Sequence, residues 1–246
     1  MKATLLMITL ALSVWGCGTE DEGSGAPAAG GAVAGAGGAG GAGAAMAGGA
    51  GGEVMETPER LPPGECIGPE QGESPPTAET IADISEETCT HCPGAEMPKW
   101  QLYDFQPQSC GYGATHGLDS FLGRVTLVAL FNAGCPYCQA QAEKMEQMRI
   151  ELEAEGHEVW FVAVNLMGRE SLQAELTNRA AFPMFQDTEG TNAWGMHQGG
   201  LSDYYVYDES GVLVTWLPNG GEVNTTLANE EGYANLKNAV LEALGE

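Results

Sequence analysis

Two cysteines separated by two residues, Cys135 and Cys138, are the residues of this sequence best suited to chemistry. A run of apolar β-forming residues, 124–131, precedes them, and a stretch with apolar residues at three- to four-residue spacing, 136–156, follows. This pattern predicts a buried strand leading into a helix, with Pro136 in its first turn. Unpaired N–H groups and the helix dipole there favour the thiolate of the first cysteine, and the second lies close enough to attack a mixed disulfide. We therefore predict that Cys135 is a nucleophile and Cys138 its resolving thiol, together forming a redox-active disulfide.

The same spacing also occurs in other kinds of site. An inert structural disulfide between Cys135 and Cys138 is one alternative, and a zinc site shared with Cys89 and Cys92 is a less favoured one. No metal and no cofactor are expected. Because the two residues between Cys135 and Cys138 add no positive charge, we predict a weaker oxidant than a motif that carries histidine there.

The remaining cysteines suggest further disulfides. Once Cys17 is set aside, an even number remains, which suits a compartment outside the cytoplasm. The stretch "CTHC" resembles redox motifs in which a histidine precedes the second cysteine. It lies in an irregular segment, so structural disulfides are favoured and an electron relay to Cys135 and Cys138 is the alternative. The four candidates, whose pairing the sequence leaves open, are Cys66, Cys89, Cys92 and Cys110.

The N-terminus resembles a secretory leader. One lysine and a short apolar run form a predicted signal peptide, 1–16, too short to span a bilayer well. The residues "VWGC" resemble a lipobox that would place a lipid on Cys17, and the Gly/Ala-rich stretch 17–52 predicts a flexible linker. We expect a lipid-anchored protein of the cell envelope, at the outer membrane because Gly18 is not the aspartate associated with inner-membrane retention. Secretion after ordinary cleavage is the alternative.

The composition argues against some partners. The net charge is −25, from 34 acidic and 9 basic residues. Such a chain is repelled by nucleic acid and by anionic membrane surfaces, so we expect no nucleic-acid partner and contact with the membrane through the anchor only. Three histidines, His116, His157 and His197, have no metal-site spacing and are predicted to lie on the surface or in loops.

The rest of the chain divides into two predicted parts. Residues 53–96 are acidic and Pro-rich, with little regular structure expected, and residues 97–246 form the folded domain. The predicted elements of that domain follow the order β, β, α, β, α, β, β, β, α, with 106–123 as a loop, 169–180 as the second helix and 202–217 as a hairpin. This order predicts an α/β fold, a mixed sheet with helices on both faces.

This arrangement resembles the thioredoxin-like superfamily, and within it the selenoprotein P N-terminal domain. The blocks that carry the resemblance run from Pro98 to Leu217 and are "PKWQLYDFQPQ", "GRVTLVALFNAGCPYC", "VAVNLMG", "FPMFQD" and "DYYVYDESGVLV". Some members have selenocysteine at the first position of the active motif, where this chain has Cys135. In thioredoxins a cis-proline opens the hairpin and a buried carboxylate precedes the first cysteine by six residues. Ser202 and Ala129 occupy these positions here, so a thioredoxin-like role toward protein substrates is not implied.

The expected function is that of an envelope thiol–disulfide oxidoreductase. Its partners would be protein thiols or disulfides and an electron donor that the sequence does not identify. A thiol peroxidase is the first alternative, since the resemblance implies a link to peroxide reduction, with sulfenic acid formed on Cys135 and Cys138 closing the disulfide. A non-catalytic binding or structural lipoprotein that keeps the fold is the second.

Overall fold

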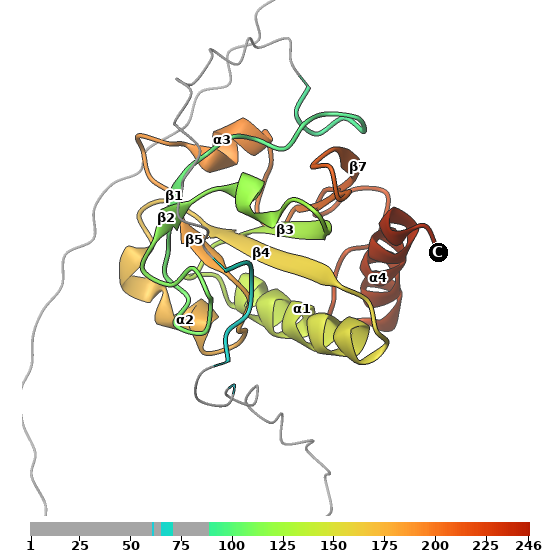
Figure 1. Cartoon of the computed structure of the whole chain (residues 1–246), viewed down its shortest axis with the longest axis horizontal. Helices are drawn as coiled ribbons and strands as arrows, with labels where there is room; N and C mark the ends of the chain where they lie inside the picture. The colour runs from blue at the N-terminus through green and yellow to red at the C-terminus, as the bar shows by residue number, and fades with distance from the viewer. Residues whose placement is uncertain (1–60, 62–64, 71–88) are drawn as a thin grey trace, which may run out of the picture. The chain divides into compact units, whose positions relative to one another are not determined.

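The computed structural model describes Leu61, residues 65–70 and residues 89–246 (Figure 1). The predicted signal peptide, Cys17, the Gly/Ala linker and most of the 53–96 segment lie outside the described residues. The division of the chain into four parts therefore stays a prediction. Within the part that is described, no helix is both long enough and apolar enough to cross a membrane.

A seven-stranded mixed sheet forms the centre of the domain, in the order β2-β1-β5-β4-β3-β6-β7. The strands β3, β4 and β5 are parallel to one another, and the pairs β1–β2, β1–β5, β3–β6 and β6–β7 are antiparallel. This is the thioredoxin-like mixed sheet that the sequence predicts. The strands are β1 (Leu102–Asp104), β2 (Thr115–His116), β3 (Val125–Phe131), β4 (Val159–Asn165), β5 (Met184–Gln186), β6 (Tyr204–Tyr207) and β7 (Leu213–Leu217).

The interior strand β3, between β4 and β6, is buried along its whole length. Because successive side chains of a strand point to opposite faces, Leu127 and Phe131 enter one hydrophobic cluster while Val128 and Leu130 enter another. Apolar residues on both faces explain why this run reads as continuous rather than alternating.

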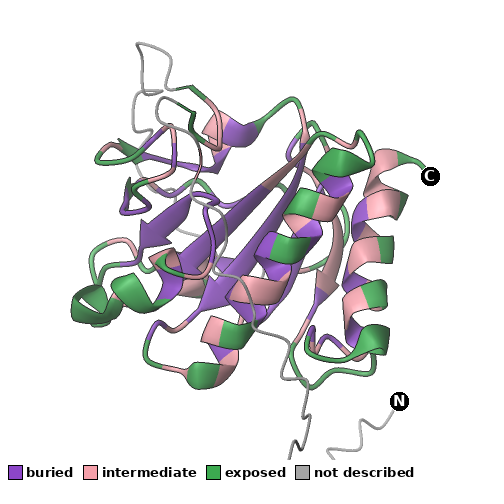
Figure 2. Ribbon diagram, turned by 90° about the horizontal axis from the view of Figure 1, so that it is seen from below, coloured by how far each residue is buried: buried purple, intermediate pink, exposed green. Residues whose placement is uncertain are grey.

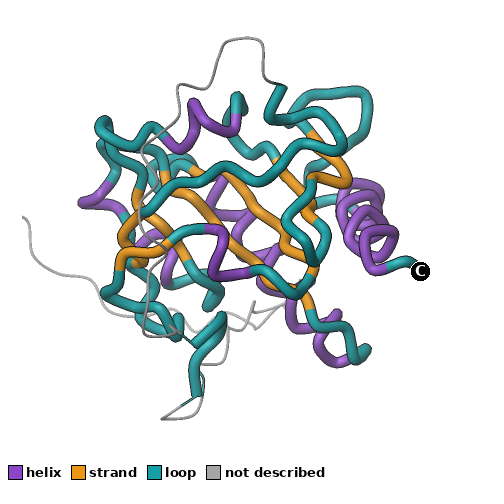
Figure 3. Tube along the Cα trace, turned by 45° about the horizontal axis from the view of Figure 1, so that its top comes forward, coloured by secondary structure: helices purple, strands orange, loops and turns teal. Residues whose placement is uncertain are grey.

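One face of the sheet is covered by α1 (Pro136–Ala154) and α4 (Glu230–Leu244), which Figure 2 shows with their exposed residues turned away from the strands. The short α2 (Ala174–Thr177) contributes Leu176 to the same core. Figure 3 shows loops crossing the opposite face. That face is also covered by η1 (Leu118–Phe121) and α3 (Ala193–His197), so both faces carry helical segments.

Two predicted elements differ from the structure. The predicted loop 106–123 contains β2, a two-residue strand too short to give a periodic pattern, as well as η1. The predicted helix 169–180 shrinks to η2 (Glu170–Leu172) and α2. In η2 and α2, Leu176 is the buried residue. A single apolar contact with the core does not stabilise a longer helix.

The prediction that the three histidines lie on the surface or in loops is wrong for two of them. His116 lies in β2 and is buried, and His197 at the end of α3 is fully buried. His197 Nε2 accepts a hydrogen bond from Trp100 Nε1 at 3.2 Å, and Nδ1 faces the Tyr207 hydroxyl at 3.4 Å. Because Trp100 can only donate, the ring proton lies on Nδ1. A lone histidine outside any periodic pattern gives no sequence sign of such burial.

Burial of His197 makes the stability of the fold depend on pH. Burial lowers the pKa of His197 to about 3, so the folded protein keeps it neutral while the unfolded chain protonates it below about pH 6.5. The stability that His197 contributes above pH 6.5 is therefore lost as the pH falls toward 3, by about 4 kcal/mol. We expect denaturant unfolding to show this loss in wild type and not in His197→Gln, which keeps an acceptor for Trp100. A His157→Gln control should keep the wild-type loss; an equal loss in His197→Gln would contradict the assignment.

Candidate active site

The predicted strand, turn and helix around the cysteine pair are confirmed. Cys135 is the N-cap of α1, with φ −103° and ψ 115°, and Pro136 follows at the first helical position. The side chain of Cys135 is half-buried, whereas Cys138, one turn further on, is fully buried in the core beneath α1. Both are free thiols. The two sulfurs therefore differ in access to solvent while sharing one helical turn.

The turn before Cys135 is held by hydrogen bonds from β4, from α1 and within the turn itself. The side chain of Asn165, the last residue of β4, accepts from the N–H of Ala133 at 2.9 Å. The Asn132 carbonyl accepts from the N–H of Cys135 at 2.9 Å, and Gln139 on α1 donates to the Ala133 carbonyl at 2.8 Å. These hydrogen bonds fix the backbone that presents Cys135.

The environment of Cys138 strongly favours its protonated form. Burial raises the pKa of the Cys138 thiol to about 11, although hydrogen bonds from the Asn132 backbone and the Ser202 side chain act in the opposite direction. The sulfur lies 3.3 Å from Ser202 Oγ. A proton therefore has to leave Cys138 before it can act as a nucleophile.

Ser202 lies just before β6 and directly against Cys138, where the resemblance expects the cis-proline. Its φ of 61° and its N–H, which donates to the Leu130 carbonyl at 2.8 Å, are both impossible for proline. Serine thus places a hydroxyl beside the Cys138 thiol, in a left-handed backbone conformation that proline cannot adopt.

Ala129 is buried in β3, paired with Tyr204 of β6, and leaves this position without a carboxylate. Nearby, Gln141 on α1 donates to the hydroxyl of Tyr204 at 3.0 Å and to that of Tyr137 at 3.3 Å. Its carbonyl oxygen accepts from the N–H of Leu227 at 3.0 Å. Burial raises the pKa of Tyr204 well above its usual value, so the Tyr204 hydroxyl keeps its proton.

Sequence reasoning missed Gln141, Tyr204 and Asn165. One available sign is that Gln141 is polar but lies at the spacing of the buried face of α1, three residues after Cys138. Asn165 ends a buried strand, which marks the edge of a parallel sheet where sites commonly form. Neither sign says which groups these side chains bind.

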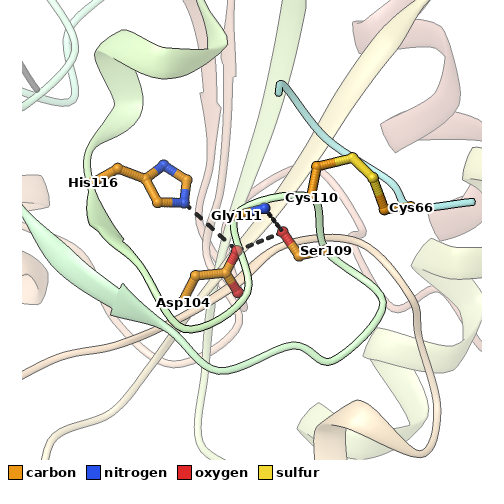
Figure 4. The surroundings of a disulfide bond; sticks show 6 residues. All are labelled: Cys66, Asp104, Ser109, Cys110, Gly111 and His116. Carbon is orange, nitrogen blue, oxygen red and sulfur yellow. Dashed lines mark hydrogen bonds and ion pairs between the residues drawn. A yellow bond between two sulfur atoms is a disulfide. The ribbon is translucent and has the colours of Figure 1, made fainter. Parts of the chain in front are cut away.

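The other four cysteines form two disulfides, Cys66–Cys110 and Cys89–Cys92. Figure 4 shows the first beside Ser109, whose hydroxyl donates to the buried carboxylate of Asp104. His116 Nε2 lies 3.5 Å from the same carboxylate. Cys89 and Cys92 are bonded to each other, so neither thiol is free to bind a metal in this structure. Across residues 65–70 and 89–246 there is no cluster of three or more side chains that could hold a metal.

The sequence profile described as "Selenoprotein P, N terminal region" matches residues 89–219. Bovine selenoprotein P is 32% identical over 128 residues, which make up 50% of this chain and 29% of the bovine protein. Human selenoprotein P is 31% identical over 128 residues, 50% of this chain and 31% of the human protein. The chain thus matches less than a third of the length of these relatives.

Solved structures with a similar chain path include a thiol:disulfide interchange protein from Bacteroides sp., with a TM-score of 0.48 and 15% identity over 64% of this chain and 93% of that one. Another is the thioredoxin domain of a thiol-disulfide oxidoreductase from Bacteroides vulgatus, with a TM-score of 0.47 and 15% identity over 61% of this chain and 98% of that one.

Proposed function

Since the chain belongs to the family of the selenoprotein P N-terminal region, we propose that it is a thiol–disulfide oxidoreductase that uses Cys135 and Cys138 as its redox couple. The observation that carries this proposal is the unequal environment of the two sulfurs. Cys135 is half-buried at the helix N-terminus, and Cys138 is fully buried one turn away. Such a pair lets one sulfur meet the substrate while the other is kept for the second step.

The reaction then proceeds by two exchanges. The Cys135 thiolate attacks one sulfur of a substrate disulfide, forms a mixed disulfide and releases the other substrate sulfur as a thiolate. Cys138 next loses its proton and attacks Cys135 Sγ, which forms the Cys135–Cys138 disulfide and releases the second substrate thiol. The protein has given up two electrons, and a dithiol donor must reduce it again before the next cycle.

The residues between the cysteines set the redox poise of the couple. Pro136 contributes no charge, and the hydroxyl of Tyr137 points toward Thr226 at 3.2 Å and Asn219 at 3.4 Å. Since neither residue places a cation near Cys135, we expect a weaker oxidant than DsbA, whose potential is about −120 mV. Protein thiols or disulfides are the expected partners.

A thiol peroxidase is the second candidate, and the burial of Cys138 favours it. Peroxide can reach the half-buried Cys135, whereas the fully buried Cys138 is protected from direct oxidation. Peroxide would oxidise the Cys135 thiolate to sulfenic acid, and Cys138 would then displace water to close the disulfide.

A turnover assay separates the two candidates. Reduced protein is mixed with insulin or with hydrogen peroxide, and the formation of the Cys135–Cys138 disulfide is followed by alkylation and peptide mapping. We expect insulin disulfides to oxidise the pair and to yield two free insulin thiols per chain. Oxidation by peroxide alone, through a trappable sulfenic acid, would favour the peroxidase. If neither insulin nor peroxide oxidises Cys135, both the oxidoreductase and the peroxidase proposals are overturned, and a non-catalytic role is left.

We also propose that the protein is a lipid-anchored component of the cell envelope, held at the outer membrane through Cys17. The leader-like sequence and the two disulfides, which persist in oxidising compartments, support this location. We expect metabolic labelling with palmitate to mark wild type and not Cys17→Ser. A labelled Cys17→Ser protein, or an unlabelled wild type found in the medium, would contradict the anchor and support secretion.

A further inference from the structure

Arg169 lies in the turn after β4, beside the turn that presents Cys135. A Cβ atom added to Gly134, the residue before Cys135, would lie 3.8 Å from Arg169 Cδ and 3.1 Å from Leu172 Cδ1. The Cδ atom of an arginine is bonded directly to the guanidinium group. The side chains of Arg169 and Leu172 therefore lie close to the backbone that immediately precedes the attacking thiol.

Asn165, the last residue of β4, connects these two turns. Its Oδ1 atom accepts from the N–H of Ala133 at 2.9 Å, and its Nδ2 atom donates to the Arg169 carbonyl at 3.4 Å. The Arg169 carbonyl also accepts from the N–H of Leu172 at 3.0 Å. The backbone of Arg169 is thus fixed relative to the turn before Cys135, and its exposed side chain extends from that point.

Arg169 differs from the other arginines that the structure describes, because its side chain has no carboxylate partner. Each of the others is paired with at least one glutamate, and these are Arg124, Arg149 and Arg179. The neighbouring Glu170 carboxylate accepts instead from the N–H of Gly168 at 3.1 Å. Among the described residues, Arg169 donates to the Gly168 carbonyl alone, at 3.4 Å, so most of its N–H donors are left for a ligand.

An unpaired arginine is unexpected in a chain with 34 acidic and 9 basic residues. A cation that is free of the protein's own carboxylates and lies next to a reactive thiol is available to a carboxylate of the substrate. The planar fork of arginine binds a carboxylate through two parallel hydrogen bonds, which fix the orientation of the bound group. Leu172, which is 38% exposed, offers an apolar contact on the same side of Cys135.

We propose that Arg169 selects substrates by binding a carboxylate next to the disulfide that Cys135 attacks. This inference rests on the proposed function of Cys135 and Cys138, and it narrows the substrate class to acidic disulfides. A carboxylate held by Arg169 positions the substrate sulfur for attack, which raises the rate of the exchange. Arg169 keeps its charge throughout, and the electrons move between the sulfurs alone.

Three small disulfides of different charge test this recognition. Glutathione disulfide is an anion, hydroxyethyl disulfide is neutral and cystamine is a cation. The full chain carries Cys138→Ser, so each reaction stops at a mixed disulfide on Cys135, which peptide mass mapping quantifies over time. We expect Arg169→Gln to slow the reaction with glutathione disulfide at least about tenfold and to change the reaction with hydroxyethyl disulfide by less than about twofold. Cystamine should react as fast as before or faster.

Two further variants serve as controls in the same background. Arg124→Gln removes the same charge just before β3, at the end of the strand far from Cys135, and should keep the reference rates with all three disulfides. Arg169→Lys keeps the charge without the planar fork, so it should restore part of the rate with glutathione disulfide. Added salt should reduce the difference between Arg169 and Arg169→Gln, because it screens exposed charges.

A pair of synthetic peptide disulfides identifies the source of the carboxylate. In one peptide the cysteine is flanked by glutamate, and in the other it is flanked by glutamine. A preference for the glutamate peptide that disappears in Arg169→Gln assigns acidic segments of proteins as substrates. A preference that depends on Arg169 with glutathione disulfide alone assigns a small acidic peptide.

The outcomes separate this inference from the proposed function. If none of the disulfides reacts with Cys135, the proposed function is wrong, and the recognition with it. If Arg169→Gln slows all three small disulfides equally, Arg169 acts on the Cys135 thiolate rather than on the substrate, and the inference is overturned. If the rate with glutathione disulfide is unchanged in Arg169→Gln, only this inference is wrong.

Discussion

Replacing Cys138 with serine is expected to lengthen the lifetime of the mixed disulfide between Cys135 and a substrate protein by at least about 100-fold. The reason is that Cys138 supplies the intramolecular thiol, and a positioned neighbour raises the effective concentration of a nucleophile by orders of magnitude. The measurement is the yield of the covalent complex with insulin on a non-reducing gel, quantified over time after mixing.

Cys135→Ser is the matched control for this trap. It removes the attacking sulfur and should give no complex and no insulin turnover, although Cys138 is still present. Since the Cys138 thiol is fully buried, it cannot replace Cys135 as the attacking group. A complex of equal yield in Cys135→Ser would contradict the assignment of the two roles, and so would rapid decay of the complex in Cys138→Ser.

The second expected result is a steep pH dependence of the resolving step. Because burial raises the pKa of Cys138 to about 11, only about one chain in ten thousand carries its thiolate at pH 7. The thiolate fraction, and with it the rate at which the mixed disulfide resolves, should rise about tenfold per pH unit from pH 7. The negative charge of the Cys135 thiolate is one cause of the raised pKa of Cys138, and this charge is absent in the mixed disulfide. The pKa of Cys138 in the mixed disulfide should therefore lie between its ordinary value of 9 and about 11, and the resolution rate should level off in that range.

Ser202→Ala tests the cause of this profile. The Ser202 hydroxyl lowers the pKa of Cys138, so its loss should raise that pKa further and slow resolution by about tenfold at every pH below the plateau. Alanine keeps the Cβ atom, so the backbone strain at φ 61° is unchanged. The rate is measured by stopped-flow mixing of a preformed mixed disulfide. A rate independent of pH between 7 and 9, or an unchanged rate in Ser202→Ala, would contradict this account.

Much of the site could be predicted because it is local in sequence. The apolar run of β3, Pro136 and the spacing of α1 together indicate a cysteine pair at a helix N-terminus, which the structure confirms. The resemblance also located Ser202 and Ala129 as departures from the thioredoxin pattern. Local periodicity and turn chemistry carry this information within a window of about 20 residues.

The rest depends on contacts between distant residues. Ser202 lies 64 residues from Cys138, and only the folded sheet places its hydroxyl on that sulfur. The pairing of the disulfides also depends on contacts between distant residues, because four cysteines allow three connectivities and local patterns do not choose among them. Buried His197 accepts a hydrogen bond from Trp100, 97 residues away, and no local pattern predicts that these two side chains meet.

The redox equilibrium of Cys135 and Cys138 tests the central claim most directly. Cys89→Ser/Cys92→Ser protein is equilibrated in buffers of defined thiol–disulfide ratio, and the Cys135–Cys138 disulfide is quantified by alkylation and mass mapping. We predict a reversible two-electron transition at a potential well below that of DsbA, about −120 mV, and within reach of thioredoxin, about −270 mV. A pair that stays reduced or stays oxidised across this whole range would contradict the account.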